Sequence, residues 1–249
     1  MYPMESQINQ RCTAITFDFW NTLAAERPGY MRQLRIERML DLLAEAGHEV
    51  SVASLSAAID SAFEQHWHSW HDNTQFLAAD GLDHALAEIG VSPSPPLRSE
   101  LRAAFELEGV NLELDAAPGI VEALESLRSQ GVAVGIICDV GFTPSVRLRS
   151  FLESSDLLDY FDYWSFSDEV GHYKPSPVIF EHALTGLGAA PANAAHVGDL
   201  RRTDVAGARS FGMRAIRYRG MNDDRSEKYP EADAVISHHG ELMEALEDR

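Results

Sequence analysis

The chain has 249 residues, enough to bury a sizeable core as one large domain or two smaller ones. Its formal net charge of −19, from 39 acidic and 20 basic residues, predicts a surface that repels the phosphate backbone of nucleic acids. No apolar run approaches the roughly 18 to 20 residues needed to cross a bilayer, and Met1–Gln10 lacks the basic start and apolar stretch of a signal peptide. We therefore expect a cytoplasmic protein, a monomer or homodimer, that binds neither nucleic acid nor membrane.

The two cysteines fit the same compartment. Cys12 and Cys138 cannot form a disulfide framework, and neither belongs to a C-x-x-C pair or a zinc-ligand pattern, so a reducing environment is expected. Lysine is rare, because only Lys174 and Lys228 occur among the 20 basic residues. Because lysine is so rare in this chain, the position of Lys174 is informative about a candidate functional site.

Three short apolar segments are predicted to be buried strands, and each ends at an aspartate. They are Ala14–Asp18, Val132–Asp139 and Ala195–Asp199. The helices predicted between and after them are Gly119–Gln130, Pro144–Leu152, Pro177–Leu187 and Thr203–Phe211, and two further strands are Met213–Tyr218 and Ala234–Ser237. This alternation indicates βαβ units and a parallel sheet, whose strand ends would bring the three aspartates to one crevice.

The segment between Ala25 and Asp115 differs, because it shows helical periodicity and no strand-like run. Four helices are predicted there, at Gly29–Ala46, Ser51–His71, Ala79–Ile89 and Pro96–Leu107. We predict an α/β fold with a Rossmann-like core and a parallel sheet, formed by residues 1–24 and 115–249. An all-α helical cap domain of residues 25–114 would be inserted into this core.

The strand-end acids need a positive partner. Asp18, Asp139 and Asp199, with Asp204 five residues further on, would repel one another in one crevice. Mg²⁺ suits a site with two or three carboxylates and room for waters and a phosphate. Lys174, just ahead of a predicted helix, would add a second positive charge. Taken singly, such an Asp is often a turn residue and such a Lys is often on the surface; the combination favours a shared site.

The order and spacing of these residues resemble the haloacid dehalogenase (HAD) superfamily of hydrolases. Its first motif is similar to Asp18-Phe-Trp-Asn-Thr22, and its second, a strand ending in Ser or Thr, falls at Cys138. Lys174-Pro175 resembles the third motif, and Gly198–Asp204 resembles the fourth, G-D-x-x-x-x-D. The resemblance covers nearly the whole chain, and the insertion after the first motif is similar to that of members with a helical cap of the first type.

The resemblance implies a role for each matching residue. Asp18 would be the nucleophile that forms a covalent aspartyl intermediate. Asp18, the backbone carbonyl of Trp20 and Asp199 would hold Mg²⁺, with Asp204 among the ligands or directly behind them. Lys174 would shield the nucleophile and steady the transferred group. Trp20, Cys138, Asp139 and Lys174 would contact the substrate.

Trp20 departs from the pattern of the family's phosphatases, which usually carry a second Asp two residues after the nucleophile. That Asp protonates the leaving group and later activates water, and an indole can do neither. Losing such acid–base help typically costs about 10²- to 10⁴-fold in rate. We therefore expect a slow phosphatase, one that favours good leaving groups, or one that takes its acid from elsewhere; Trp20 can pack beneath the cap at the same time.

Two other branches of the family tolerate a residue other than an acid here. The phosphonoacetaldehyde hydrolases form an imine with a cap lysine, which is excluded because residues 25–115 contain no lysine. The 2-haloacid dehalogenases are similar in having an aromatic residue, and their halide-binding arginine would be Arg27, Arg32 or Arg35. They work without metal and lack the G-D motif, which is intact here as Gly198–Asp204. The intact metal-binding motif therefore favours a phosphate ester over a haloacid as the substrate.

Two further features allow more than one interpretation. At Cys138 a thiol, a weak hydrogen-bond donor, replaces the usual hydroxyl, and Asp139 follows where Asn is common. The simplest explanation of Cys138 is a small buried residue at the end of a strand. A thiolate nucleophile at Cys138 is less favoured, because no base lies nearby in the sequence. The stretch His66–His71 places histidines and tryptophans on shared helix faces, which suits packing better than a zinc pair without a third ligand.

The leading hypothesis is a Mg²⁺-dependent HAD-type hydrolase, a phosphatase that acts on a small phosphorylated metabolite through Asp18. A hydrolase of carbon–halogen bonds is the second hypothesis. A pseudoenzyme or binding protein on the same scaffold is the third, motivated by Trp20 and Cys138. If another group supplies the missing proton, His172 and the cap histidines are the first candidates.

Overall fold

A six-stranded parallel sheet forms the centre of the protein. The computed structural model describes residues 12–247, so the expectation about Met1–Gln10 lies outside the described residues. The strands are β1 (Ala14–Phe17), β4 (Ala133–Cys138), β5 (Tyr163–Phe166), β6 (Ala194–Gly198), β7 (Arg214–Tyr218) and β8 (Ala234–Ile236), in the order β5-β4-β1-β6-β7-β8. β1 lies between β4 and β6, and Phe17 pairs with Ile136 and Val197. The prediction of a parallel α/β sheet is confirmed.

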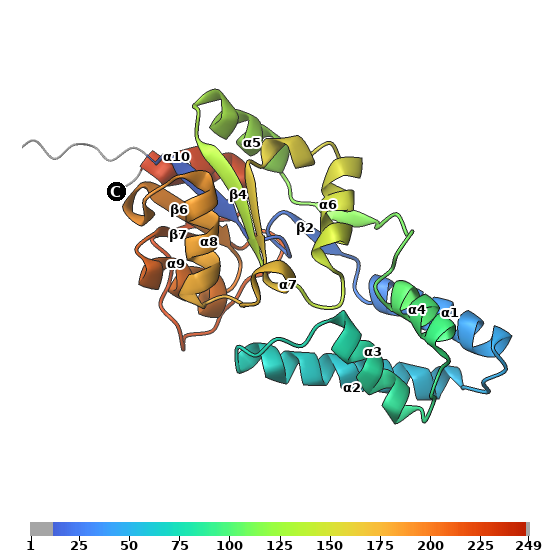
Figure 1. Ribbon diagram of the computed structural model, residues 1–249. Helices are drawn as coiled ribbons and strands as arrows, with labels where there is room; N and C mark the ends of the chain where they lie inside the picture. Colours follow the sequence, from blue (N-terminus) through green and yellow to red (C-terminus); the bar gives the residue numbers. More distant parts are fainter. Residues whose placement is uncertain (1–11, 248–249) are drawn as a thin grey trace, which may run out of the picture.

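Helices cover both faces of the sheet (Figure 1). One face packs against α5 (Ile120–Ser129), α6 (Ser145–Ser154) and α10 (Leu242–Glu247). The other face packs against α8 (Pro177–Leu187) and α9 (Ala206–Phe211). Successive side chains of a strand point to opposite faces, so Ile15 and Phe17 join the first core and Ala14 joins the second. The helices on the two faces do not cover the carboxyl ends of the central strands.

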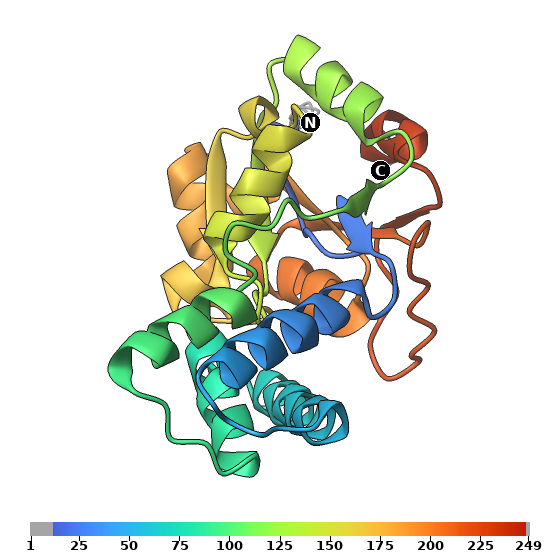
Figure 2. The same ribbon diagram turned by 90° about the vertical axis from the view of Figure 1, so that its right-hand side faces the viewer.

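Four further helices form a separate layer beyond that open end (Figure 2). They are α1 (Tyr30–Glu45), α2 (Val52–His71), α3 (Ala78–Glu88) and α4 (Pro95–Phe105), and they have a hydrophobic core of their own. We call residues 27–113 the helical insert, because they lie between two short paired strands, β2 (Ala24–Glu26) and β3 (Leu114–Ala116). Among residues 12–247, no helix is both long enough and apolar enough to span a bilayer.

Phe142 joins the insert to the sheet layer. It lies in the loop after β4, is 2% exposed, and belongs to the core of the insert. Its ring centroid is 4.6 Å from that of Phe63 and 5.1 Å from that of Phe105. A Cβ on Gly81 would lie 2.6 Å from the Phe142 ring, so a larger residue at this position of α3 would force the ring to move. The loop that follows β4 is therefore anchored in the insert.

Some elements differ from the prediction. The strands β2 and β3 interrupt the segment that was expected to be wholly helical, and at three residues each they are too short to show a period. The prediction also lacks β5, because its sequence, Tyr-Trp-Ser-Phe, is interrupted by Ser165 and shows no continuous apolar run. It likewise lacks α7 (Ser167–Val170) and α10. The domain boundaries at residues 25 and 114 stay a prediction.

Candidate active site

Three carboxylates meet where the central strands end. Asp18 directly follows β1, Asp199 directly follows β6, and Asp204 lies in the π-helical turn Arg201–Val205. One oxygen from each lies within 4.8 Å of the others, and the three residues are between 2% and 6% exposed. The parallel register places these strand ends side by side, as the sequence predicts.

The spacing of the Gly198–Asp204 segment has a steric basis. The turn folds Asp204 back against the end of β6, where a Cβ built on Gly198 would lie 2.3 Å from the Asp204 Cγ. Asp204 is also held from within the turn, because its Oδ2 accepts from the Leu200 N–H at 2.9 Å. Glycine at position 198 is therefore required for Asp204 to approach the sheet.

Lys174 is the positive group of this cluster. It is 2% exposed, and its Nζ donates to Asp18 Oδ1 at 2.5 Å, to Asp204 Oδ1 at 2.7 Å and to the Ile137 carbonyl at 3.0 Å. Burial acts to lower the pKa of Lys174, but Asp18 and Asp204 outweigh burial and raise it well above its usual range. Lys174 is therefore a buried ammonium rather than the surface residue that its place before a proline can also suggest.

One lysine does not balance the three acids. Burial raises the pKa of Asp18 well above its usual range, and burial together with Asp204 raises the pKa of Asp199 to about 7. Burial also acts to raise the pKa of Asp204, but Lys174 and His196 outweigh it, so this pKa is strongly lowered. The cluster therefore holds more negative charge than it can stabilise, which a divalent cation would relieve.

The carboxylates differ in how many hydrogen bonds they already accept. Both oxygens of Asp204 are engaged, because Lys174 and His196 donate to Oδ1 and the Leu200 N–H donates to Oδ2. Among the described residues, only Oδ1 of Asp18 accepts a hydrogen bond. The donor set thus fits a hard cation bound directly by Asp18 and Asp199, with Asp204 behind them.

Sequence reasoning missed two partners of the acids. His196, buried in β6, shares a 2.8 Å hydrogen bond with Thr16 and donates from Nε2 to Asp204 Oδ1 at 3.1 Å. Asn222 donates from Nδ2 to Asp199 Oδ2 at 2.6 Å. The only sequence signal was their position, one in a predicted strand beside Asp199 and the other in the polar segment after the next strand.

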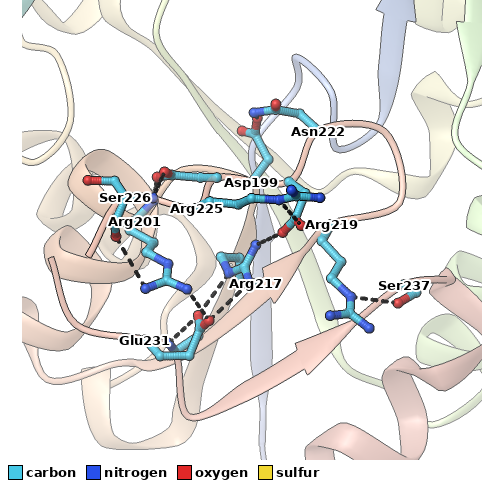
Figure 3. Close-up of polar contacts among 12 residues, drawn as sticks. Asp199, Arg201, Arg217, Arg219, Asn222, Arg225, Ser226, Glu231 and Ser237 are labelled. Carbon is cyan, nitrogen blue, oxygen red and sulfur yellow. Dashed lines mark hydrogen bonds and ion pairs between the residues drawn. The ribbon is translucent and has the colours of Figure 1, made fainter. Parts of the chain in front are cut away.

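An arginine cluster fixes the loop that carries Asn222 (Figure 3). Arg217, from β7, makes two hydrogen bonds to the Glu231 carboxylate, at 2.8 and 2.9 Å, and a third to Asp223 at 2.9 Å. Arg201 reaches the same Glu231 at 2.6 Å. Because such forked pairs hold both partners in one orientation, the loop between β7 and β8 is fixed beside Asp199.

A cavity of about 470 Å³ opens beside the acidic cluster. Its polar lining includes Asp18, Glu26, Arg35, His66, Asp139, Lys174, Asp199, Asp204 and Asn222. Its apolar lining includes Trp20, Met31, Phe63, Trp67, Trp70 and Phe142. The two layers of the protein thus both contribute to one cavity, large enough for a small metabolite.

The four residues predicted to contact substrate occupy different positions. Trp20 is half buried, lines the cavity and packs edge-on against Phe19, with ring centroids 5.0 Å apart. Lys174 also lines the cavity. Cys138 does not: it is fully buried, and burial raises the pKa of its thiol well above the usual range. This placement disfavours both a substrate contact and a thiolate nucleophile at Cys138.

Asp139 lines the cavity with Asp18 and Asp199, but it lies outside the cluster of three carboxylates. Its Oδ1 accepts from the Lys174 backbone N–H, and its Oδ2 accepts from the Trp70 indole N–H, both at 2.8 Å. Both oxygens of Asp139 therefore already serve as acceptors, one of them for a donor in the helical insert, and its contact with substrate stays a prediction.

Only one of the three cap arginines considered from sequence reaches the cavity. Arg27 pairs with Glu113 and Arg32 with Asp60, both on the outer surface. Arg35 is 2% exposed, lines the cavity, and donates to the Phe105 carbonyl and to Thr143 Oγ1, each at 2.8 Å. Burial lowers its pKa to about 10, and Glu26 opposes that shift.

The histidine and tryptophan stretch makes packing contacts. In residues 12–247 one cluster of three metal-ligating groups occurs, and no residue of His66–His71 belongs to it. Trp70 is buried, and the Arg202 guanidinium carbon lies 3.6 Å from its ring centroid. His66 faces the cavity, while His172 is exposed and lies outside the cavity lining.

The family is shown by a match over most of the chain. The family model of the haloacid dehalogenase-like hydrolases matches residues 12–212, which include the whole acidic cluster, Lys174 and the helical insert. The chain belongs to this family. It is thus a hydrolase of the HAD superfamily, in agreement with the sequence motifs and the parallel sheet.

Relatives of this HAD-like hydrolase include both phosphatases and dehalogenases. It is 34% identical to a glyceraldehyde 3-phosphate phosphatase of Pyrococcus furiosus over 54% of this chain and 55% of the relative. It is 26% identical to (S)-2-haloacid dehalogenase 1 of a Pseudomonas species over 68% of this chain and 70% of the relative. The chain spans only a little more than half the length of the first curated relatives it matches.

Two solved structures have the same fold. A HAD phosphatase from Thermococcus onnurineus matches with a TM-score of 0.66 and 27% identity, over 94% of this chain and 97% of that one. A 2-haloacid dehalogenase from Pseudomonas syringae matches with a TM-score of 0.68 and 27% identity over the same shares. The fold therefore does not separate the two activities.

Proposed function

We propose that this HAD-like hydrolase is a Mg²⁺-dependent phosphatase that acts on a small phosphorylated metabolite through an aspartyl-phosphate intermediate. The observation that carries the proposal is the buried cluster of Asp18, Asp199 and Asp204, whose oxygens lie within 4.8 Å. Phosphatases are also named more often than dehalogenases among the relatives. Substrate would enter the cavity between the sheet and the helical insert, which would act as the cap.

The chain's own residues suit phosphoryl transfer. An oxygen of Asp18 attacks phosphorus and the bond from phosphorus to the leaving oxygen breaks, so the phosphoryl group becomes an ester of Asp18. Lys174, which contacts Asp18 and Asp204, would balance the negative charge of the transferring group. A water then attacks phosphorus, which releases inorganic phosphate and restores the Asp18 carboxylate.

The metal would be held by Asp18, Asp199 and the backbone carbonyl of Trp20, with Asp204 behind them. When bound, Mg²⁺ would neutralise charge on the phosphoryl oxygens. Asn222 would orient Asp199 through the 2.6 Å hydrogen bond to its carboxylate. Lys174 and His196 would orient Asp204 in the same way.

Hydrolysis of a carbon–halogen bond is the second candidate, and Arg35 is the observation that favours it. Arg35 is a buried cation on the cavity wall, and Trp20 supplies an aromatic residue two positions after the nucleophile. The intact acidic cluster opposes this assignment. A protein that only binds ligand in the cavity is the third candidate.

A substrate screen separates the three. The wild-type protein is assayed on phosphate esters and on 2-haloacids, with millimolar Mg²⁺ and with a chelator. Phosphate release that requires Mg²⁺ and falls by at least about 10³-fold in Asp18→Asn supports the proposal. Metal-independent halide release would select the second candidate, and no turnover on either class would select the third.

A further inference from the structure

Phosphoester hydrolysis needs a group that moves a proton, and Trp20 cannot do so. The titratable cavity residues are Asp18, Glu26, Arg35, His66, Asp139, Lys174, Asp199 and Asp204. Asp18, Asp199 and Asp204 are assigned to the nucleophile and the metal, and Lys174 is bound to two carboxylates. Both oxygens of Asp139 already accept hydrogen bonds. Arg35, Glu26 and His66 remain.

Two of these three are poorly suited. Arg35 is a guanidinium that remains charged in the neutral range and donates to Phe105 and Thr143. Glu26 accepts a hydrogen bond from the Met31 N–H at 3.0 Å, at the start of α1. Its charge also acts on Arg35. His66 has neither limitation.

The orientation of the His66 ring is fixed by one hydrogen bond. Its Nδ1 lies 2.9 Å from the Phe76 carbonyl, and a carbonyl oxygen only accepts, so Nδ1 carries the hydrogen. The ring also packs on Phe142 and Tyr173, with centroids 5.2 and 6.1 Å away. These contacts on two sides leave the opposite nitrogen, Nε2, in a defined position.

Nε2 is the open atom of this ring. No hydrogen-bond partner of His66 Nε2 is found within residues 12–247, although His66 lines the cavity. A Cβ built on Gly141 would lie 3.4 Å from Nε2, so this atom faces the loop that follows β4. The same loop begins with Asp139 beside Lys174. The unpartnered nitrogen thus faces the backbone of Gly141, which lines the same cavity as Asp18.

We propose that His66 of the helical insert is the proton-transfer group of this hydrolase, acting from Nε2 in place of the acid that Trp20 replaces. The inference rests on the proposed phosphatase function. As the P–O bond breaks, protonated His66 gives its Nε2 proton to the leaving alkoxide, which departs as an alcohol. Neutral His66 then takes a proton from the water that attacks phosphorus while Asp18 leaves as a carboxylate. The imidazolium is thereby restored, and protons balance over the two steps.

The surroundings of His66 predict how its activity depends on pH. Burial lowers the pKa of His66 below 6.5, and the hydrogen bond to Phe76 offsets only part of that shift. The titratable group in contact is the phenol side chain of Tyr173, whose pKa is raised to about 12, so it is neutral in this range. Most of the protein therefore carries neutral His66 at pH 7, and the protonated fraction rises as the pH falls.

The test compares alkyl and aryl phosphates, because a phenolate leaves without a proton and an alkoxide does not. His66→Asn removes the titrating ring and retains a donor near Nδ1. We expect it to lower kcat/KM for an alkyl phosphate by about 10²-fold and to change the aryl value by less than about threefold. The alkyl value in the wild type should rise as the pH falls from 8 to 6, and this slope should be absent in His66→Asn.

Two matched variants complete the experiment. His68→Asn changes an exposed histidine on the same helix and should leave both substrates unaffected. Glu26→Gln tests the remaining cavity acid. The inference would be overturned if His66→Asn lowered kcat/KM equally for the alkyl and the aryl phosphate. It would also be overturned if Glu26→Gln, rather than His66→Asn, selectively lowered kcat/KM for the alkyl phosphate. A wild-type protein without Mg²⁺-dependent phosphate release would refute the phosphatase function itself, which keeps the two failures distinct.

Discussion

The indole N–H of Trp70 donates to Asp139 across the boundary between the helical insert and the sheet layer. The Nε1–Oδ2 distance is 2.8 Å, and the other oxygen of Asp139 accepts from the Lys174 backbone N–H. The Arg202 guanidinium, from the turn that carries Asp204, covers the Trp70 ring. One carboxylate thus connects α2 to the residue whose ammonium contacts the nucleophile.

Trp70→Phe should weaken this connection while keeping an aromatic ring for Arg202. Hydrogen bonds to charged groups contribute about 1.5 to 3 kcal/mol, so the free energy of unfolding should fall by an amount in this range. Urea denaturation measures it. Trp67→Phe is the matched control, because Trp67 is 57% exposed and makes no hydrogen bond to the sheet layer within residues 12–247. Equal stability of the two variants would show that the contact contributes nothing.

Magnesium should stabilise the protein through the acidic cluster. A ligand present at 100 times its Kd stabilises the native state by about 2.7 kcal/mol, so millimolar Mg²⁺ should raise the Tm if its Kd lies in the micromolar range. Asp199→Asn should remove that rise. Asp159→Asn, which changes an exposed acid, should keep it. A wild-type Tm that ignores millimolar Mg²⁺ would count against a metal site at Asp18 and Asp199.

The sequence predicted the parts of the site that depend on strand ends. Asp18, Asp199 and Asp204 could be placed together because the carboxyl ends of adjacent parallel strands share one edge. Lys174 could be placed by its family motif. The long helices α1 and α2 have clear periods, and α2 also has a capping residue, Ser51, whose Oγ accepts from the Ser54 N–H at 3.0 Å.

The rest depends on contacts between segments that are distant in sequence. Asn222 reaches Asp199 because the Arg217–Glu231 pair fixes its loop, and no spacing encodes that pair. Asp139 accepts hydrogen bonds from Trp70 and Lys174, which lie 69 and 35 residues away, and no motif indicates these contacts. Chain order predicts which residues end strands, but it does not predict the partners that folding brings to them.

His239 should make stability depend on pH. It is fully buried, stacks on Tyr218 and lies with Nε2 2.8 Å from the Thr22 carbonyl; burial lowers its pKa to about 4. Between pH 6.5 and 4 the unfolded chain therefore binds a proton that the folded protein does not. Stability from this group is complete above pH 6.5 and falls by about 3 kcal/mol on acidification to pH 4.

His239→Gln isolates that contribution, because glutamine can still donate to Thr22 but does not titrate. The difference in unfolding free energy between wild type and variant should change by about 3 kcal/mol between pH 7 and pH 4. The carboxylates of both proteins titrate alike, so they cancel in this difference. A difference that stays constant with pH would mean that folding does not change the pKa of His239.

Trp20→Asp should restore the acid that the first motif lacks. At pH 8, where His66 is mostly neutral, the wild type should hydrolyse aryl phosphates better than alkyl phosphates, and the variant should raise the alkyl-to-aryl ratio of kcat/KM by about 10²-fold. Trp20 is half buried against Phe19. Removing a large aromatic side chain from a packed position costs up to about 3 to 5 kcal/mol, so the ratio is measured on protein shown to be folded.

The double variant Trp20→Asp/His66→Asn then distinguishes a restored acid from a loosened cavity. If the introduced carboxyl group supplies the proton, the alkyl rate no longer needs the imidazole, and His66→Asn should have less than about a threefold effect in this background. If the indole only fills space, the substitution should change both substrates together and the His66→Asn effect should persist at about 10²-fold. A wild-type enzyme that hydrolyses alkyl and aryl phosphates equally fast at pH 8 would contradict both assignments, because neither Trp20 nor a neutral His66 can protonate an alkoxide.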